Sequence, residues 1–459
     1  MRIVGPKDLP TLAREPELPF ELVLEDGSFV VTEVLRHLPG RRLTVGTHDS
    51  VRGAGVLKLF FGPHHERDCG RALRGQEGFT KASVETTPII AQSRTNQAKT
   101  QLAWMLFARF QGASHADERD AIELADILGR LHFHGFSHTD LHLGNFLKTP
   151  AGALISIDSD AIEPEVLSVR EGLAELAVLL AQFEIPTQPD LGDCLDAYLA
   201  AREESSGLVA QSTLRRLLAK AIRSRSAHYL QKALRECTNF MVREEAGRRW
   251  FCRREVSAVF AKFMEDPERF FGEGANVLKR GNSATVVSVD LPGQKLVAKR
   301  YNITSVGHRF RRIFRRRARE AWQNGLRLAF LGIPTAVPLG LIETGSRWWP
   351  GPAYVLMERL EGKDLATLTR SGYIDSFTLK DLVAIIDALQ RSGLTHGDLK
   401  STNFILSRGK LYLIDVDSIR VSRFGQKRDV LRLLANWTPE APARSTIREA
   451  LQAAGLKGA

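Results

Sequence analysis

The chain of 459 residues is longer than a single hydrophobic core usually supports, so two domains, or three, are expected. Its composition, 43% hydrophobic and 25% charged residues, is that of a folded globular protein and excludes a disordered chain. Four dispersed cysteines exclude a disulfide framework and a zinc cluster, while the net charge of +11 favours an anionic partner such as nucleic acid, a phosphorylated ligand or a membrane face.

The beginning of the chain predicts a small antiparallel sheet. The opening MRIVGPKDLP lacks the charged-then-apolar run of a secretion signal, and no apolar stretch approaches the roughly 20 residues of a membrane span. We therefore expect a cytoplasmic protein without a transmembrane segment. Between residues 20 and 61, apolar and polar residues alternate and turn residues separate the runs, a pattern typical of strands.

Helical patterns follow this sheet. Residues 64–83 predict a helix, and QLAWMLFARF predicts a further strand. From Asp117 onward, DERDAIELADILGRLHFHG has apolar residues at helical spacing and stops at Gly135. Short strands and further helices extend the first half to about residue 235, where STLRRLLAKAIRSRSAHYLQKALREC predicts one or two basic helices.

The second half repeats this order of elements. NVLKRGNSATVVSVDLPGQKLVAKRY predicts three strands joined by turns, and RRRAREAWQNGLRLAFLGI predicts a helix. A strand in PAYVLMERL and a helix in TLKDLVAIIDALQRSG complete the series. Because the repeat is as long as a domain, we expect two tandem α+β domains, 1–235 and 236–459, each with a β-rich small lobe on a helical large lobe.

One set of polar residues occurs in both halves at the same point in this order. The first copy, FSHTDLHLGNFL, is followed by ALISIDSD, and the second, LTHGDLKSTNFIL, is followed by LYLIDVDSI. Each copy has an Asp, an Asn five residues later, and a strand that ends in acid. Phosphoryl transfer from ATP needs such groups: a carboxylate to receive a hydroxyl proton, ligands for Mg²⁺, and a cation on the phosphate oxygens.

In the second half these roles fall on five residues. Asp398 is the candidate base, and Asn403 and Asp415 are the candidate Mg²⁺ ligands. Lys299, in KLVAKRY, is the candidate strand lysine for the nucleotide phosphates. Glu320, on the next helix, is its expected ion-pair partner.

The first half offers the same parts. Asp140 is its candidate base, Asn145 and Asp158 are its candidate Mg²⁺ ligands, and Lys58 in VLKLFF is its candidate phosphate cation. The second acid of each strand end is expected to stabilise the loop more than to bind the metal.

Several neighbouring residues have expected roles of lesser weight. The glutamate expected to pair with Lys58 is Glu77, because its distance from this lysine fits best, and Glu85 is the alternative. His138 and His396 are expected to pack and to hydrogen-bond the loops, whereas His142 either contacts a substrate or is solvated.

Both halves resemble the protein-kinase-like superfamily, and the second closely resembles the lipopolysaccharide core heptose kinase and InaA-like family. The resembling stretches of the second half are VLKRGNSATVVSV, LVAKRYNI, RRIFRRRAREAW, HGDLKSTNFIL and LIDVD, while LHFHGFSHTDLHLGNFL and ISIDSD carry the resemblance of the first. The resemblance implies ATP and Mg²⁺ between the lobes, with Gly281 and Met357 also at the nucleotide. It further implies a heptose hydroxyl of the lipopolysaccharide inner core as acceptor, at the cytoplasmic side of the inner membrane.

The sequence departs from regulated protein kinases at three points. Thr139 or Gly397 stands between His and Asp in place of an arginine, no APE follows either metal-binding Asp, and KRGNSAT holds a single glycine. These departures favour a constitutive glycolipid kinase whose side chains hold the phosphates. The alternatives are a protein serine/threonine kinase, or a scaffold in which one or both domains bind nucleotide or glycolipid without turnover.

The segment RFRRIFRRRARE, 309–320, concentrates positive charge. At helical spacing such like charges repel one another, which favours an external anion over a solvated face. We expect the lipopolysaccharide core or an anionic membrane surface as the partner, and no nucleic acid, because no aromatic stacking platform accompanies the run. The residues expected to contact it are Arg311, Arg312, Arg315 and Arg316.

Overall fold

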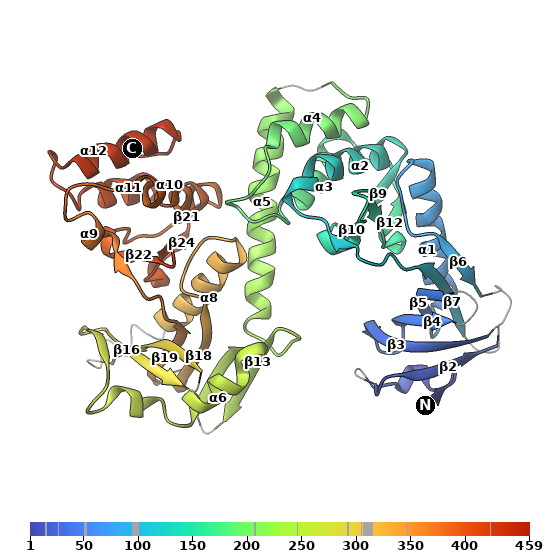
Figure 1. The fold of residues 1–459 in the computed structure, drawn as a ribbon, viewed down its shortest axis with the longest axis horizontal. Helices are drawn as coiled ribbons and strands as arrows, with labels where there is room; N and C mark the ends of the chain where they lie inside the picture. Colours follow the sequence, from blue (N-terminus) through green and yellow to red (C-terminus); the bar gives the residue numbers. More distant parts are fainter. Residues whose placement is uncertain are drawn as a thin grey trace. The chain divides into compact units, whose positions relative to one another are not determined.

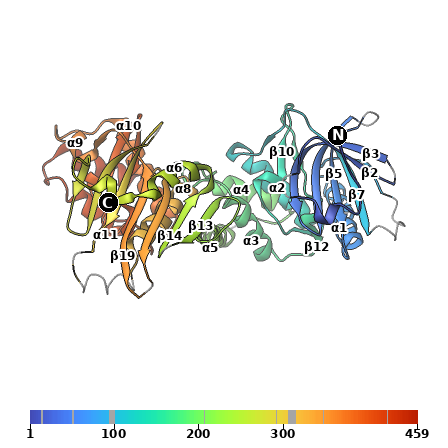
Figure 2. The same cartoon turned by 90° about the horizontal axis from the view of Figure 1, so that it is seen from below.

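The computed structural model divides the chain into two compact units, each described here by itself (Figures 1 and 2). Unit 1 comprises Met1–Phe183 with Gln188–Leu218, and unit 2 comprises Glu184–Thr187 with Ala219–Ala459. The division falls inside helix α5 (Leu208–Lys232), earlier than the expected boundary at residue 235. The structure describes residues 1–13, 16–25, 27–49, 53–93, 101–205, 208–245, 247–291, 293–303, 305, 315–346, 348–422 and 424–459.

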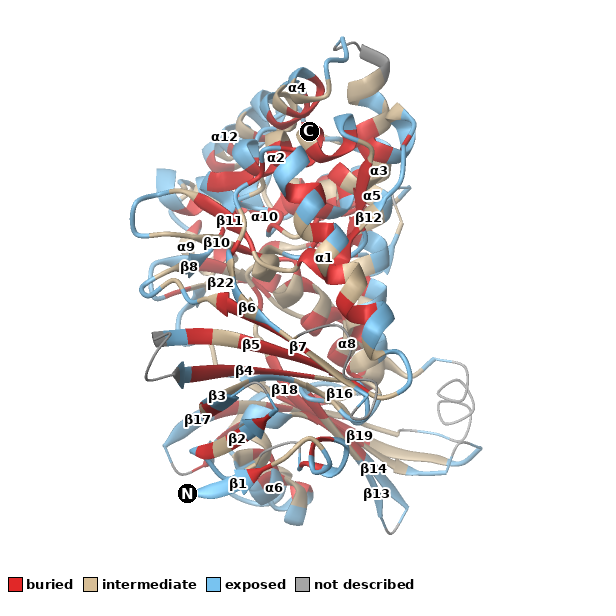
Figure 3. Ribbon diagram, turned by 90° about the vertical axis from the view of Figure 1, so that its right-hand side faces the viewer, coloured by how far each residue is buried: buried red, intermediate tan, exposed pale blue. Residues whose placement is uncertain are grey.

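A seven-stranded sheet begins unit 1, in the order β1-β2-β3-β4-β5-β7-β6. Alternating apolar residues give the strands a buried face, on which Phe20 and Phe29 are fully enclosed (Figure 3). Helix α1 (His65–Lys81) packs against the sheet through Cys69 and Ala72, so the predicted strands and helix are confirmed. The strands are β1 (Arg2–Val4), β2 (Phe20–Leu24), β3 (Gly27–Leu38), β4 (Arg42–Asp49), β5 (Gly53–Phe61), β6 (Ile89–Gln92) and β7 (Leu102–Ala108).

Helices and short strands form the rest of unit 1. Helix α2 (Ala121–Phe133) ends near Gly135, as predicted, because this glycine takes a φ of +75° that a helix cannot continue. The chain then enters β9 (Phe136–His138) and the first motif loop. The other elements are β8 (Ser114–His115), η3 (Leu143–Asn145), β10 (Phe146–Lys148), β11 (Leu154–Ser156), η4 (Ser159–Ala161), β12 (Ile162–Pro164), α3 (Val169–Leu180) and α4 (Leu191–Ala201).

Unit 2 also begins with a seven-stranded sheet, in the order β13-β14-β18-β19-β17-β16-β15. Phe260 and Phe263 of α6 (Ser257–Glu265) pack in one apolar cluster of this sheet, while Trp322 of α8 (Arg317–Phe330) packs in another. The three strands predicted from residue 276 onward are confirmed. The strands are β13 (Phe240–Glu245), β14 (Arg248–Arg253), β15 (Val277–Arg280), β16 (Ala284–Leu291), β17 (Gln294–Tyr301), β18 (Pro338–Gly345) and β19 (Pro350–Glu358).

The second part of unit 2 follows the same order as that of unit 1. Helix α10 (Ser376–Arg391) ends near Gly393, at φ +72°, and leads into β21 (Leu394–Thr395) and the second motif loop. Within the described ranges, no helix is long and apolar enough to cross a membrane. The other elements are α9 (Leu365–Leu368), η7 (Ser401–Asn403), β22 (Phe404–Ser407), β23 (Lys410–Leu413), η8 (Val416–Ser418), β24 (Arg420–Val421), α11 (Gln426–Leu434) and α12 (Pro442–Ala453).

Candidate phosphoryl-transfer sites

Each motif loop is closed by its own asparagine. Asn145 Nδ2 donates a hydrogen bond to the Asp140 carbonyl at 2.9 Å, and Asn403 Nδ2 donates to the Asp398 carbonyl at 2.9 Å. The amide nitrogen is therefore committed to the loop, which leaves the carbonyl oxygen Oδ1 as the atom that can bind a cation. Asn403 is buried, whereas Asn145 is partly exposed.

The motif histidines are structural, as expected. His138 and His396 are buried, and their Nδ1 atoms accept hydrogen bonds from the backbone N–H groups of Asp140, at 3.4 Å, and Asp398, at 3.3 Å. Burial lowers the pKa of His138 to about 4 and also lowers the pKa of His396. Both rings are therefore neutral acceptors that orient the backbone of the candidate base.

Two acids that the sequence reasoning missed hold the motif loops by accepting hydrogen bonds from their backbone. Glu175 of α3 accepts a hydrogen bond from the His138 backbone N–H at 3.0 Å. Asp429 of α11 accepts bonds from the backbone N–H groups of His396 at 2.6 Å and Gly397 at 3.0 Å. In each unit a carboxylate on the following helix thus fixes the start of the motif loop. Nothing in the local sequence pattern signalled these partners.

The buried state of His138 predicts a pH dependence of stability. Its folded pKa lies below the ordinary 6.5, so between pH 6.5 and about 4 the unfolded chain binds more protons and stability rises with pH. We expect the free energy of unfolding to fall on acidification more steeply in the wild type than in His138→Asn, by up to on the order of 3 kcal/mol. Urea unfolding at several pH values measures this.

Asparagine at position 138 keeps an acceptor for the Asp140 N–H, so the comparison isolates the titrating ring. His134→Asn, at an exposed position, is the matched control and should keep the wild-type slope. Equal pH slopes for the wild type and His138→Asn would contradict a buried neutral imidazole.

Each unit brings its strand lysine to the acids after the motif. Lys58 Nζ, on β5, lies 2.8 Å from Asp158 Oδ1 and 3.2 Å from Asp160 Oδ1. The pKa values of these two carboxyls shift in opposite directions. Burial and the neighbouring Asp160 raise the pKa of Asp158, whereas the pKa of Asp160 is lowered. The structure therefore joins residues about a hundred positions apart in the sequence, as the motif assignment requires.

The corresponding cluster of unit 2 is strongly charged. Lys299 Nζ, on β17, lies 2.5 Å from Asp415 Oδ1 and 3.5 Å from Asp417 Oδ2. Burial opposes the charge on Lys299, but Tyr301, Asp417 and Asp415 together outweigh it and raise the pKa of the ammonium. Burial also opposes the charge on Asp415, yet Lys299 lowers the pKa of this carboxyl overall. An ammonium and a carboxylate thus face one another, as the candidate roles of Lys299 and Asp415 require.

Asp415 has an unusual backbone. Its φ of +59° and ψ of +51° place it in the left-handed region, which aspartate tolerates better than most residues. Its counterpart Asp158 has a φ of −116° and ψ of +73° instead. Backbone strain of this kind is concentrated at functional sites, where the surrounding structure enforces it. Asp415 therefore differs from Asp158 in backbone conformation, although both lie beside the strand lysine.

The helix after the lysine strand holds the acid loop in both units. In unit 1, Gly75 of α1 lies so close to the Ser159 carbonyl oxygen that an added Cβ would stand 1.7 Å from it. In unit 2, the buried Asn324 of α8 donates to the carbonyls of Val416 at 3.0 Å and Ile419 at 3.2 Å. A small residue in one unit and an amide in the other achieve the same close contact.

The ion pair predicted between Lys299 and Glu320 is wrong. Glu320 pairs with Arg315 at 3.0 Å and with Arg420 at 3.4 Å. The first residue of α8, Arg317, instead reaches Asp417 at 2.7 Å. Because the loop acids already neutralise the lysine, the helix contributes a cation to this cluster and not an anion.

Unit 1 shows the same correction. Glu77 and the alternative Glu85 are both exposed, while Lys58 is buried with its loop acids. Helix α1 directs Arg71 to Asp160, with Arg71 Nη2 at 3.9 Å. The cation from the helix is thus common to both units.

The other two predicted nucleotide contacts lie on the expected strands. Gly281 is exposed in the turn between β15 and β16, where its N–H donates to the Ala284 carbonyl at 3.0 Å. Met357 is two residues after Val355, which pairs with Lys299 across β17 and β19. Residues two apart on a strand share a face, so Met357 is on the lysine side of the sheet. The nucleotide contacts expected of both positions stay predictions.

The surroundings of the two candidate bases differ. Asp398 lies 2.8 Å from Lys400 Nζ and 3.8 Å from Arg432 Nη1, two cations that the sequence reasoning did not select. Lys400 could have been found from its place two residues after the base. In unit 1 that place is taken by His142, whose Nδ1 accepts from the Gly144 N–H at 2.9 Å and caps η3.

The candidate metal ligands of each motif fit Mg²⁺ only if a nucleotide supplies further ligands. Across the described residues, no three His, Cys, Asp or Glu side chains converge as they would in an all-protein metal site. Each motif offers one amide oxygen and one carboxylate, from Asn145 and Asp158 or from Asn403 and Asp415. Mg²⁺ is commonly bound by one or two such ligands with phosphate oxygens and waters completing the octahedron. These residues fit that arrangement.

The arginine segment is more neutralised than predicted. Arg311 and Arg312 lie outside the described residues. Arg315 pairs with Glu320, and Arg316 Nη1 lies 3.4 Å from Glu343 Oε2, which Arg319 also contacts. Both Arg315 and Arg316 precede α8, so the expected helical crowding does not apply to them.

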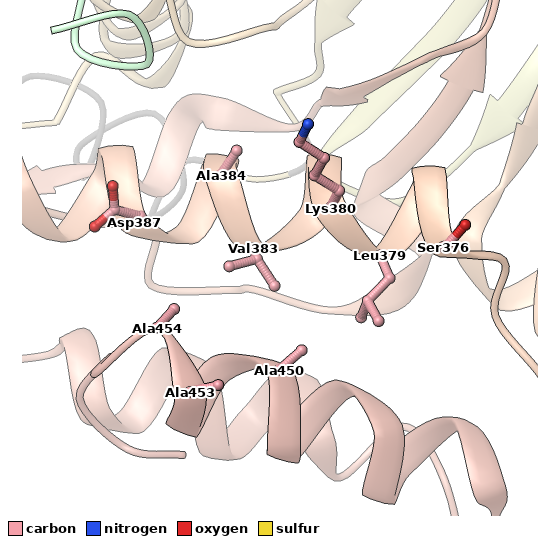
Figure 4. A pocket seen from close by; sticks show the side chains of 9 residues that line it. All are labelled: Ser376, Leu379, Lys380, Val383, Ala384, Asp387, Ala450, Ala453 and Ala454. Atoms are coloured by element: carbon pink, nitrogen blue, oxygen red, sulfur yellow. The ribbon is translucent and has the colours of Figure 1, made fainter. Parts of the chain in front are cut away.

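The cavities do not all coincide with the motif residues. One of about 660 Å³ lies between α10 and α12, lined by residues such as Leu379, Val383 and Ala450 (Figure 4), and contains no motif residue. Another, of about 180 Å³, lies at the motif loop of unit 1 and is lined by Asp140, Asp158 and four arginines. Size alone is therefore a poor guide to the chemistry of this protein.

Comparisons with known proteins give the following likenesses. No protein-family model and no curated protein match the chain. The solved structure of WaaP in complex with acyl carrier protein is similar with a TM-score of 0.32 and 19% identity, over 43% of this chain and 88% of that chain.

Two further structures are similar over a smaller part. The ROP18 kinase domain in complex with AMP-PNP and sucrose has a TM-score of 0.24 and 18% identity, and a Stt7 homolog from Micromonas algae soaked with ATP has 0.25 and 17%. Each of these two matches covers 31% of this chain. The matched part is 50% of the ROP18 chain and 48% of the Stt7 homolog chain, so this chain spans about half of each. TM-scores this low carry no argument, so the candidate roles of the motif residues rest on the side-chain geometry alone.

Proposed function

We propose that this protein is an ATP- and Mg²⁺-dependent kinase that phosphorylates a sugar hydroxyl, in particular a heptose hydroxyl, of the lipopolysaccharide inner core. The observation that carries the proposal is the convergence in unit 2 of Lys299 with Asp415, 2.5 Å apart, after a loop in which Asn403 fixes Asp398. A lysine on a strand, a carboxylate beside it and an Asn-closed loop that carries a second acid are the parts that phosphoryl transfer uses.

In the proposed reaction, the Asp398 carboxylate takes the proton of the attacking hydroxyl. The hydroxyl oxygen bonds to the γ-phosphorus as the bond between this phosphorus and the β–γ bridging oxygen breaks, and ADP leaves. Lys299 turns from Asp415 to the phosphate oxygens, while Arg317 keeps Asp417 in place. Lys400, 2.8 Å from Asp398, is placed to hold a γ-phosphate oxygen beside the base. Mg²⁺, when bound by Asn403 and Asp415, neutralises charge on the phosphates.

Unit 1 contains the same arrangement of Lys58, Asp140, Asn145 and Asp158, so it is proposed as a second kinase-like domain in tandem with the first. The alternatives from the sequence stay as rivals: a protein serine/threonine kinase, or a unit that binds nucleotide or glycolipid without turnover. The exposed Asp140 lacks the lysine that accompanies Asp398, which favours unit 2 as the main site of transfer.

A peripheral membrane location is proposed from unit 2. The turn between β18 and β19 exposes Trp348 and Trp349, at 70% and 53% of their surface. Tryptophans are favoured at the membrane–water interface, where an apolar ring meets a polar headgroup. Arg316 and Arg319 line a cavity of about 560 Å³ together with Gly345, at the end of β18. Glu343, with which both arginines pair, also lines this cavity, so the proposed membrane contact rests mainly on the two exposed tryptophans and on the rest of the arginine segment.

The arginine segment gives a test of this location. Changing Arg311, Arg312, Arg315 and Arg316 to Gln should weaken binding to anionic vesicles or lipopolysaccharide at least tenfold, about 1.4 kcal/mol, while ATP affinity changes little. Wild-type binding should also fall steeply as salt is raised, since exposed charges are screened within about 10 Å at 0.1 M. Vesicle co-sedimentation measures both effects.

A control with the same loss of charge replaces four exposed cations elsewhere with Gln and should keep wild-type binding. These are Arg2, Lys7, Arg74 and Lys410. Equal binding by the wild type and the variant of the arginine segment at low salt would remove the support for an anionic surface.

The proposed substrate is tested in cells. Lipopolysaccharide core isolated with and without the protein should differ by the mass of a phosphate group, and the difference should return with the wild-type chain. Identical core masses would contradict a core sugar as acceptor while leaving the fold and the nucleotide site unaffected.

A further inference from the structure

Helix α11 of unit 2 has an exposed side that is basic and apolar and contains no acid. The one acid of the helix, Asp429, is buried. The exposed positions recur at spacings of three and four residues, so they share one side of the helix. A fully exposed phenylalanine precedes the helix, one residue before its N-cap. These residues, which we call the α11 surface, are Phe424, Lys427, Arg428, Leu431 and Arg432.

The protein does not balance the charges of the α11 surface. Among the described residues, neither Lys427 nor Arg428 forms an ion pair. Both belong to the first turn of α11, where the helix dipole disfavours cations. Arg428 and Arg432 are four residues apart on the helix, and like charges at this spacing repel one another. An external anion would relieve each of these unfavourable contacts.

The α11 surface adjoins the candidate base. The Nη1 atom of Arg432 lies 3.8 Å from Asp398 Oδ1 and donates a hydrogen bond to the Gly397 carbonyl. The segment before the helix is tied to the strand that leads into the motif loop, because Thr395 Oγ1 donates to the Ser422 carbonyl at 2.6 Å. An acceptor whose hydroxyl reaches Asp398 therefore lies beside this surface.

The counterpart helix of unit 1, α3, lacks these cations. Glu175 of α3 and Asp429 of α11 both accept hydrogen bonds from the N–H of the motif histidine, which aligns the two helices. The residues of α3 that correspond to Lys427, Arg428, Leu431 and Arg432 are uncharged. The basic side is thus an addition to unit 2 and is not part of the arrangement that the units share. In chain order, the corresponding residues are Leu173, Ala174, Ala177 and Val178.

We propose that the α11 surface binds an anionic lipid bilayer, with lipid phosphates against Lys427 and Arg428 and the ring of Phe424 among the headgroups. Basic residues are attracted to anionic membranes, and exposed apolar side chains gain by leaving water at the interface. A free phosphate would engage the cations but leave Phe424 and Leu431 in water. The inference rests on the proposed function for its acceptor, since a bilayer at this surface brings its headgroup layer to Asp398.

Co-sedimentation of the full chain with phosphatidylcholine vesicles, with and without phosphatidylglycerol, tests this surface. We expect the wild type to bind the vesicles that contain phosphatidylglycerol, and the double variant Lys427→Gln, Arg428→Gln to bind them at least tenfold more weakly. Phe424→Ser should weaken binding severalfold but keep its dependence on salt, because the variant retains both cations.

A control variant loses the same charge elsewhere in unit 2. Lys363→Gln combined with Lys410→Gln, both at exposed positions, should keep wild-type binding to the vesicles. The melting temperature of every variant is compared with that of the wild type, so that loss of binding is scored only in folded protein. Wild-type binding by a folded Lys427→Gln, Arg428→Gln variant would overturn the proposal.

Phosphate transfer separates a bilayer from the acceptor itself as the occupant of the surface. The double variant should lose transfer to lipopolysaccharide embedded in the vesicles and keep transfer to soluble core oligosaccharide. An equal loss with both acceptors would overturn the proposal, because Lys427 and Arg428 would then bind the acceptor and not the bilayer. If the wild type transfers phosphate to neither acceptor while its vesicle binding still depends on these two cations, the proposed function fails and the α11 surface stands.

Discussion

Replacing Asp398 with alanine is expected to lower the phosphate incorporation by unit 2 about 10²–10⁴-fold, the usual contribution of a positioned general base. The side chain is 43% exposed, so the fold should survive its removal. The backbone of the loop is held independently by Asp429 and Asn403. The loss should therefore appear in kcat, with little change in the melting temperature or in ATP affinity.

The same change in unit 1 divides the activity between the units. If both are active, Asp140→Ala removes part of the incorporation, and the double variant removes nearly all of it. Asp196→Ala, in α4 and outside both motifs, is the control. Unchanged incorporation and unchanged product positions in Asp140→Ala would make unit 1 a non-catalytic partner, and full activity of Asp398→Ala would contradict the assignment of the base in unit 2.

Replacing Asp415 with asparagine should abolish most of the stabilisation that Mg²⁺-ATP gives to unit 2. A ligand at 100 times its Kd stabilises a folded protein by about 2.7 kcal/mol. Asparagine tolerates the left-handed backbone at φ +59° and keeps the side-chain size, so the variant removes the charge and little else. Without the carboxylate, the proposed metal site keeps only the Asn403 oxygen as a protein ligand, so the metal-mediated contact between the phosphates and the protein is weakened.

Thermal unfolding with and without Mg²⁺-ATP measures this effect. Asp290→Asn, at an exposed position of β16, should keep the wild-type shift in Tm. If Mg²⁺-ATP raises the Tm of Asp415→Asn as much as that of the wild type, Asp415 is not the metal ligand.

The local parts of the site could be predicted from sequence because they depend on short spacings. Asp140 and Asn145, or Asp398 and Asn403, are five residues apart, and one hydrogen bond within the loop fixes their relation. The lysine strands were also predictable, since alternation within the sheet marks them. The prediction of two tandem domains followed from finding both patterns twice.

Features that depend on distant contacts were not predictable. Glu175 and Asp429 lie 37 and 33 residues after the histidines whose N–H groups they accept, and no local pattern links them. Strand β14, in RRWFCR, forms a hairpin with β13 and pairs on its other side with β18, where Trp250 faces Ile342. The partner on the β18 side lies far along the chain, beyond the reach of any local pattern.

The sequence also could not show whether Arg317 or Glu320 contacts the cluster around Lys299. The two residues are three positions apart on α8, so both lie on the same side of the helix. Where the helix begins decides which of them reaches the loop acid. Because α8 starts at Arg317, this residue meets Asp417, and Glu320 lies a turn later, beside Arg315 and Arg420.

The most direct test of the proposed function is transfer of labelled phosphate from γ-labelled ATP to purified lipopolysaccharide core oligosaccharide, beside a generic protein substrate in a parallel reaction. We expect label on the oligosaccharide, dependent on Mg²⁺ and lost in the double variant Asp140→Ala, Asp398→Ala, with none on the protein substrate. Label on the protein substrate alone would support a protein kinase. No label on either acceptor, from a chain that still binds Mg²⁺-ATP, would contradict catalysis and leave a nucleotide-binding scaffold.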